Sequence, residues 1–269
     1  MPNALYPPLK PRTFAELLDA VLQIFRLSLL KCLPYATLAI IAGQVSTLYY
    51  MWRGRWPLPA LDGNDPVGVA LYGVGTLIFV MLSVTILLRQ SAIAAGRPVT
   101  GSTDLLDTLK RAPAIVAIAV LVSAAITAFV LPALALAPAY RTAGLAVMLA
   151  PAIYIGIALS FSVPALVLAQ KGVLASLAYS FRLVRGNWWR VTAIYIVGLM
   201  VVLTLLMLVA SITTIALADN GAGDAAITRA ITSAAFLAVM AVGLTFWSAL
   251  NLALFGDLQI RRMTSSTGR

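Results

Sequence analysis

Long hydrophobic runs separated by short polar segments make up most of this chain. Six of the runs are long enough to cross a hydrocarbon core of about 30 Å as helices, which takes about 20 residues each. The pattern therefore predicts membrane spans at about residues 33–51, 67–88, 114–137, 143–169, 191–218 and 231–255. We expect a tight turn at residues 138–142 between the third and fourth spans, and another at Asp219-Asn220-Gly221 between the fifth and sixth.

Three segments with helical periodicity precede the odd-numbered spans, at about residues 13–31, 102–111 and 172–187. The first begins with Thr13 and has Glu16 three residues later, the signature of a capping box. Apolar and polar residues alternate at helical spacing in each segment, so we expect amphipathic helices that lie in the membrane interface. Residues 16–19 (ELLD) match residues 104–107 (DLLD). This match predicts a threefold repeat of surface helix plus helical hairpin.

Composition supports the same fold class. Hydrophobic residues make up 61% of the chain and charged residues only 10%, with a mean hydropathy of +0.97. A soluble domain needs about 25% charged residues to face water, so lipid must cover most of this surface. The prediction is an all-α polytopic membrane protein in which residues 1–269 form a single integral membrane domain.

The net charge of +10 does not indicate nucleic-acid binding, because the cations lie in short segments between the spans. The distribution of these cations predicts the membrane topology instead. Fifteen Lys and Arg residues fall on the side that holds both termini, and four fall on the other side: Arg53, Arg55, Arg141 and Arg229. We therefore expect both termini to be cytoplasmic and no nucleic acid to bind.

Catalytic groups are scarce in this sequence. None of the nine acidic residues falls inside a predicted span, there is no histidine, and Cys32 is the single cysteine. This pattern argues against a proton-coupled pump, an intramembrane protease and a metal or cofactor site. We predict a protein that is not an enzyme and has no cofactor. The pairs Asp257–Arg261 and Asp107–Lys110 are interpreted as local helix pairs worth a few tenths of a kcal/mol.

Two primary amides within the spans, Gln44 and Asn251, are the intramembrane polar candidates, because an amide in hydrocarbon must find partners. Helix packing and ligand contact are both open interpretations. Pro132, Pro151 and Pro164 should kink or interrupt the third and fourth spans.

A basic and aromatic segment precedes the fifth span. Its candidate binding residues are Arg182, Arg185, Asn187, Trp188, Trp189 and Arg190. Tryptophan and arginine anchor helices at the membrane surface, which explains the segment without a ligand. The alternative is that the arginines, helped by Asn187, bind anionic lipid headgroups or phosphate.

The region 161–198 resembles a bacterial six-span inner-membrane family. That family includes the membrane domain fused to some glycerophosphodiester phosphodiesterases and the YciC-like membrane proteins. Three features carry the resemblance: Val163-Pro164, the Ser180-x-Arg182-Leu183 helix, and residues 186–190 (GNWWR). Phe14-x-x-Leu17-Leu18 with Phe25-Arg26 is similar to the start of that family. Gln170 and Lys171 stand where such families often carry an acid, so no role for that acid is transferred. The resemblance implies a bacterial inner-membrane location.

Three functions fit these observations. The leading hypothesis is a non-enzymatic membrane module that binds lipid or a partner protein, in envelope lipid handling or export. The alternatives are a transporter or channel for a small or amphipathic solute, and a membrane protein for toxin resistance or immunity. Expected partners are anionic lipid headgroups on the cytoplasmic side, with a protein partner or a homo-oligomer as further options. A polar-lined cavity holding Gln44 or Asn251 would favour transport.

Overall fold

The computed structural model describes residues 5–54, 65–98, 101–134, 136, 138–219 and 225–267. This part of the chain is helical and contains no strand, which confirms the predicted fold class. The helices are α1 (Phe14–Trp52), α2 (Pro66–Ala94), α3 (Gly101–Lys110), α4 (Ala112–Leu134), α5 (Pro138–Leu159), α6 (Ser162–Val167), α7 (Val173–Val184), α8 (Trp188–Asp219) and α9 (Ala225–Thr267).

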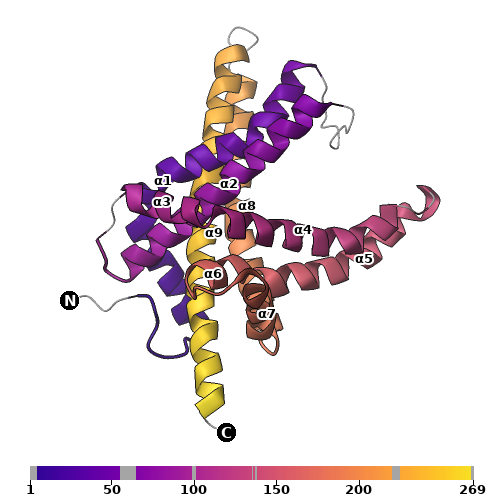
Figure 1. Cartoon of the computed structure of the whole chain (residues 1–269). Coiled ribbons are helices and arrows are strands. Elements are labelled where there is room, and N and C mark those ends of the chain that lie inside the picture. Colours follow the sequence, from indigo (N-terminus) through magenta and orange to yellow (C-terminus); the bar gives the residue numbers. More distant parts are fainter. Residues whose placement is uncertain are drawn as a thin grey trace.

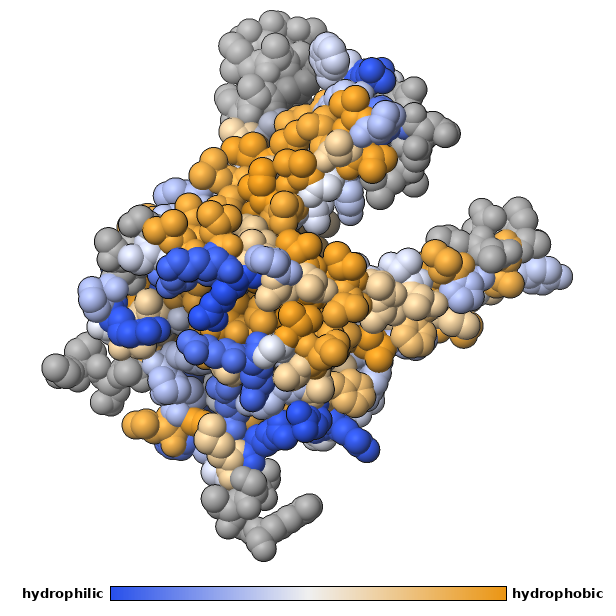
Figure 2. All heavy atoms as spheres, viewed as in Figure 1, coloured by the Kyte–Doolittle hydropathy of each residue, from blue (hydrophilic) through white to orange (hydrophobic). Residues whose placement is uncertain are grey.

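Six helical segments in the described residues are long and apolar enough to cross a membrane, and the chain is a multi-pass membrane protein. They are Phe14–Trp52, Pro66–Ala94, Ala112–Pro132, Thr142–Val167, Trp188–Ile215 and Thr232–Thr264. Figure 2 shows that hydrophobic residues cover the helical arms, a surface suited to lipid. Hydrophilic residues gather towards the lower end of the visible face, away from the arms. Each predicted span overlaps one of these segments.

The spans form three antiparallel pairs that diverge from a common base (Figure 1). Helices α1 and α2 pack along each other as one arm, and α9 crosses them, with α8 at its side. The α4–α5 hairpin extends away from the other two pairs and meets them mainly near its base, where α6 and α7 lie. The base therefore holds the molecule together, and the arms leave a gap between α2 and α5.

The predicted surface helix at residues 13–31 is not separate from the first span, which corrects the sequence-based boundary. The capping box is confirmed, because Glu16 N–H donates to Thr13 Oγ1 and Thr13 N–H donates to the Glu16 carboxylate. From there α1 runs for 39 residues through Pro34. At about 1.5 Å per residue it is about 58 Å long, nearly twice a hydrocarbon core of about 30 Å. One buried face continues past Pro34, from Ile24 and Cys32 to Ala36, and this packing outweighs the lost hydrogen bond.

The fourth span is interrupted as expected from Pro164, whose ring excludes the helical carbonyl of Ser160 and whose nitrogen cannot donate to it. Helix α5 ends at Leu159 and α6 begins at Ser162. The Ser180 hydroxyl on α7 donates to Ala158 O (2.7 Å) and accepts from Phe161 N–H (3.1 Å). A side chain from α7 thus satisfies the backbone groups that the break leaves free.

Two further boundaries differ from the sequence-based expectation. Helix α4 ends at Leu134 and α5 begins at Pro138, so residues 138–142 are helical rather than a turn. Proline suits a first helical turn, because the missing N–H would have no partner there. The α9 helix continues to Thr267, about three turns beyond the predicted end of the sixth span at residue 255. The expected turn at Asp219-Asn220-Gly221 extends beyond the described residues after Asp219.

Gln90 joins the three helices that cross at the centre. Its side chain is fully buried, and its Nε2 donates to Ser28 Oγ on α1 (3.1 Å) and to Thr245 O on α9 (2.9 Å). The predicted second span ends at about residue 88, just before Gln90. In the fold it is an interhelical hydrogen-bonding residue, as polar side chains in membrane bundles commonly are.

The second and third predicted surface helices correspond to α3 and α7, although α7 ends at Val184 rather than near residue 187. Their position in the membrane interface and the threefold repeat stay predictions. The two matching tetrapeptides lie in different surroundings, since Leu17 is fully buried whereas Leu105 and Leu106 are exposed. The exposed ion pair Lys110–Asp107 (3.7 Å) on α3 fits the local helix pair that the sequence indicated.

Candidate functional site

A buried carboxylate organises the base of the molecule. Asp257 on α9 has no exposed surface, and its Oδ2 contacts Arg261 Nε at 2.8 Å and Arg190 Nη2 at 3.4 Å. Its Oδ1 accepts from the backbone N–H of Arg12 at 2.7 Å. The expected local pair with Arg261 is present, but the carboxylate is also fully buried and has Arg190 and a backbone N–H as further partners. It is therefore a structural centre rather than an isolated helix pair.

The segment before α1, residues 5–12, crosses the base as a strap. Arg190 and Arg261 both donate to the carbonyl of Arg12, while Leu5 and Tyr6 donate backbone N–H groups to Ala94 O at the end of α2. Burial lowers the pKa of Arg12, and the nearby Asp257 carboxylate opposes that shift. The strap connects α2, α8 and α9 and places the start of α1 beside the end of α9, so both ends of the described chain lie at the base.

Gly256 makes room for this strap. A Cβ atom at Gly256 would lie 2.8 Å from Pro8 Cδ and 3.0 Å from Tyr6 Cε2. Real Cβ atoms do not approach heavy atoms so closely, because the contact is well inside the van der Waals optimum of about 3.5–4.0 Å between carbon atoms. A glycine directly before Asp257 therefore lets the strap pack on α9 at the level of the buried carboxylate.

An arginine-lined recess lies beside the strap, between the α7–α8 connection and the end of α9. We call it the arginine recess. Its volume is about 390 Å³, and it is lined by Pro11, Arg182, Leu183, Arg185, Asn187, Leu258, Arg261, Arg262 and Thr264. Four of these nine residues are arginines and none is acidic. The recess therefore presents positive charge, part of which, at Arg261, is neutralised by the buried Asp257.

The α7–α8 connection shapes one wall of the recess. Helix α7 ends at Val184, and Gly186 has φ +92°, a left-handed conformation that glycine adopts without a Cβ clash. Asn187 N–H donates to Val184 O at 2.9 Å, which closes a tight turn before α8. Arg185 and Asn187, on either side of the glycine, both face the recess.

The structure separates the six residues that the sequence singled out before the fifth span. Arg182, Arg185 and Asn187 line the recess, whereas Arg190 points inward to Asp257. Trp188 packs on Tyr154 of α5, with ring centroids 5.6 Å apart. Trp189 is 80% exposed, which suits a residue at headgroup level. The residues for which the sequence left anchoring and binding open thus lie in different surroundings, although they belong to one short segment.

Among the four arginines of the recess, Arg261 and Arg262 are the two that the sequence analysis did not single out. The Arg261 guanidinium is shared between Asp257 and the recess, and Arg262 lies over the Tyr179 ring at 5.2 Å from its centroid. The predicted sixth span ends at about residue 255, but α9 continues through both arginines. The useful signal was the helical spacing of Asp257 and Arg261, which extends the sixth span by one turn.

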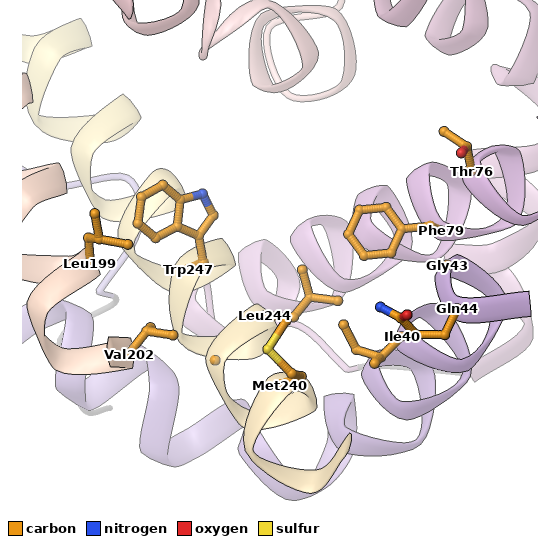
Figure 3. A pocket seen from close by; sticks show the side chains of 11 residues that line it. Ile40, Gly43, Gln44, Thr76, Phe79, Leu199, Val202, Met240, Leu244 and Trp247 are labelled. Carbon is orange, nitrogen blue, oxygen red and sulfur yellow. The ribbon is translucent and has the colours of Figure 1, made fainter. Parts of the chain in front are cut away.

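The two amides within the spans line neighbouring cavities that share Phe79, Leu199, Leu244 and Trp247. Gln44 lines the smaller one, of about 430 Å³, between α1, α2, α8 and α9 (Figure 3). Asn251 lines the larger one, of about 690 Å³. Asn251 is also held by the protein, since Tyr195 Oη donates to its Oδ1 at 2.7 Å. The packing interpretation therefore holds for Asn251 without excluding a ligand next to it.

Comparison with known proteins agrees with the resemblance found in the sequence. A family model described as the membrane domain of glycerophosphoryl diester phosphodiesterase matches residues 112–268, more than half of the chain. The match runs from α4 to α9 and covers every residue of the arginine recess except Pro11. The comparisons with curated proteins and with solved structures returned no match.

Proposed function

The chain belongs to the family of membrane domains of glycerophosphoryl diester phosphodiesterases, and from this premise we propose that it is a non-enzymatic module that binds anionic lipid headgroups at the arginine recess. The bound group would be a lipid phosphate at the cytoplasmic face of the bacterial inner membrane. The excess of Lys and Arg on that side of the sequence supports this orientation, with both termini in the cytoplasm.

The observation that carries the proposal is the meeting of four arginines in one recess without an acidic lining residue. Arginine binds phosphate oxygens through two parallel N–H groups, and such charge-assisted bonds are about twice as strong as neutral ones. Arg182 and Arg185 are exposed and come from α7 and its end, whereas Arg261 and Arg262 come from α9. A phosphate between them would therefore be held from two sides.

The surroundings of the recess favour a lipid over a free anion. Leu183 and Leu258 line it together with the arginines, and the exposed Trp189 belongs to the same end of α8. An anionic surface also attracts such a basic cluster, at about 1 kcal/mol per Lys or Arg near the membrane. A headgroup can thus contact the arginines while its chains stay in the membrane.

The test is binding of phosphatidylglycerol against phosphatidylcholine by the full chain in detergent, followed by native mass spectrometry. The double variant Arg182→Gln/Arg185→Gln should lose most of the preference for phosphatidylglycerol. The matched control is Arg26→Gln/Lys31→Gln, which removes the same charge from exposed positions on α1 and should keep the preference. Glycerol phosphate added as a competitor separates a headgroup site from a site for the soluble anion. Equal binding by both double variants would refute the proposal.

Transport of an amphipathic solute is the second candidate, and one observation favours it. Gln44 and Asn251, two side chains far apart in the sequence, line adjoining cavities between the arms. A counterflow assay with fluorescent lipid in proteoliposomes would test it, because a transporter must move lipid between leaflets whereas a binding module need not. Movement that depends on Asn251 would favour transport over the binding module.

A further inference from the structure

The larger cavity lies inside the membrane-spanning part of the protein, away from the arginine recess. We call it the inter-arm cavity. Residues from α2, α5, α6, α8 and α9 line its 690 Å³, a volume within the range of about 300–1,000 Å³ that small-molecule sites occupy. Figure 2 shows the molecule open between the α1–α2 arm and the α4–α5 arm, with hydrophobic residues on both sides of the opening. A ligand could therefore enter from lipid.

The lining of the inter-arm cavity excludes charged ligands. Its walls are formed largely by aliphatic and aromatic side chains such as Val80, Leu87, Ile153 and Leu199, and none of its described lining residues is charged. An unpaired charge in hydrocarbon surroundings is strongly disfavoured. The occupant must be mainly hydrocarbon, with at most an uncharged polar end.

Six uncharged polar residues interrupt this apolar lining, and two of them, Ser83 and Thr192, donate their hydroxyls to carbonyls of their own helices. The other four form a cluster. Ser160, Tyr195, Ser248 and Asn251 all line the cavity, and Tyr195 Oη lies 2.7 Å from Asn251 Oδ1 and 3.0 Å from Ser160 Oγ. Asn251 Nδ2 donates to Trp247 O at 2.9 Å. The hydrogen bonds fix the cluster, but they use only part of the donors and acceptors that a hydroxyl and an amide offer.

Ser248 is the member of the cluster that points to a ligand. Its side-chain oxygen has no hydrogen-bond partner among the described residues, and the residue is only 9% exposed. Ser248 and Asn251 are three residues apart on α9, so they share a face of the helix. A buried hydroxyl without a partner is unfavourable in hydrocarbon. A hydroxyl or ester oxygen of a ligand would satisfy it.

The neighbouring cavity gives the site its length. It continues from the shared residues Phe79 and Trp247 towards Gln44 and Thr76, which come from α1 and α2 (Figure 3). The combined space is thus elongated and mainly apolar, with the polar cluster of Ser160, Tyr195, Ser248 and Asn251 in its larger part. This shape fits an extended hydrocarbon chain better than a compact solute.

We infer that the inter-arm cavity binds a long-chain amphiphile with an uncharged hydroxyl or ester end, such as a monoacylglycerol or diacylglycerol. The polar end contacts Ser248 and the Tyr195–Asn251 pair, and the chain lies along Leu199 and Phe79. This site is separate from the arginine recess in position and in the charge of its ligand. It therefore does not depend on the proposed headgroup binding.

The experiment uses the full chain in detergent with a diazirine-bearing monoacylglycerol as probe, photocrosslinking and peptide mapping. We expect saturable labelling of peptides from α2, α8 and α9 that unlabelled monoacylglycerol prevents. Ser248→Ala removes only the hydroxyl. It should weaken binding of the probe by about tenfold, which corresponds to the loss of one buried hydrogen bond. Leu199→Trp should abolish saturable labelling by filling the cavity, and it is tolerable because Leu199 is 48% exposed.

Two controls separate this inference from other outcomes. Ser211→Ala removes an exposed hydroxyl on α8 that bonds within its own helix, and it should label like the unmodified chain. Arg182→Gln/Arg185→Gln should also keep full labelling, even if it loses phosphatidylglycerol. The inference would be overturned if the labelling could not be saturated. It would also be overturned if the unmodified chain, Ser248→Ala and Leu199→Trp were labelled equally. Loss of labelling in the arginine variant would overturn the separation of the two sites.

Discussion

Arg190 and Asp257 are 67 residues apart in the chain, yet the guanidinium Nη2 of the first lies 3.4 Å from the carboxylate Oδ2 of the second. The carboxylate has no exposed surface, and Arg190 also donates to the carbonyl of Arg12 at 2.8 Å. This contact joins the start of α8, the end of α9 and the strap before α1. The base of the bundle is therefore held by charge as well as by apolar packing.

Replacing Asp257 by Asn should destabilise the protein strongly. Arg190 and Arg261 would keep their charges without the buried carboxylate, and breaking a buried pair typically costs about 3–5 kcal/mol. Thermal unfolding in detergent, followed by circular dichroism, should show a clear fall in Tm. Asp107→Asn is the control, because its pair with Lys110 is exposed and is worth at most about 1 kcal/mol. An equal, small effect of both substitutions would contradict the role of Asp257.

Replacing Gly256 by Ala should release the strap without removing any charge. The new methyl group would overlap Pro8 and Tyr6, and these residues would have to move away from α9. Hydrogen exchange of the Leu5 and Tyr6 amides, both bonded to Ala94 O, should become faster. Gly73→Ala is the matched control, since a Cβ there meets nothing within 4 Å. Unchanged exchange in the Gly256 variant would show that the strap does not depend on this glycine.

Replacing Ser180 by Ala should weaken the break between α5 and α6. Ala158 O and Phe161 N–H would lose their shared partner in a buried place, at a cost of about 1–3 kcal/mol for each group left unsatisfied. Chemical unfolding in mixed detergent should report a lower free energy of unfolding. The exposed Ser211→Ala substitution should stay within about 0.5 kcal/mol of the unmodified chain. Similar values for the two variants would argue that Ser180 is dispensable.

Asp65 predicts a pH dependence at the end of the bundle away from the base. It caps α2 and is 7% exposed, and the Gly68 backbone N–H that donates to its carboxylate lowers its pKa. A group whose pKa is lowered on folding stabilises the fold above its unfolded pKa, and this contribution is lost as the pH falls through the folded pKa. Asp65→Asn should therefore be less stable than the unmodified chain at pH 7. A difference in Tm that stayed constant down to pH 2 would contradict this.

Local patterns were sufficient to predict the spans and the start of α1. Hydrophobic run length marked all six spans, because hydrocarbon leaves the backbone few options other than helix. The Thr13–Glu16 capping box needed only three residues of context. The break at Ser160 and Phe161 also followed from Pro164, although its partner Ser180 did not, since α7 brings that hydroxyl from another part of the chain.

Long-range contacts account for what the sequence could not reveal. The sequence indicates only a local helix pair between Asp257 and Arg261, because nothing local shows that the strap and Arg190 also contact the carboxylate. The arginine recess was recognised only in part, since Arg261 and Arg262 reach it through the continuation of α9. The predicted boundary between a surface helix at 13–31 and the first span is absent, because the packing of α1 continues across it. In each case tertiary contact decided the environment of a polar residue.

The most direct test of the account is the topology of the chain, because the headgroup proposal requires the arginine-rich base to face the cytoplasm. Reporter fusions of alkaline phosphatase and green fluorescent protein placed after Trp56 and after Lys171 measure it. The account predicts phosphatase activity only after Trp56 and fluorescence only after Lys171. The same compartment for both sites would contradict the topology, and with it the placement of the arginine recess at the cytoplasmic membrane surface.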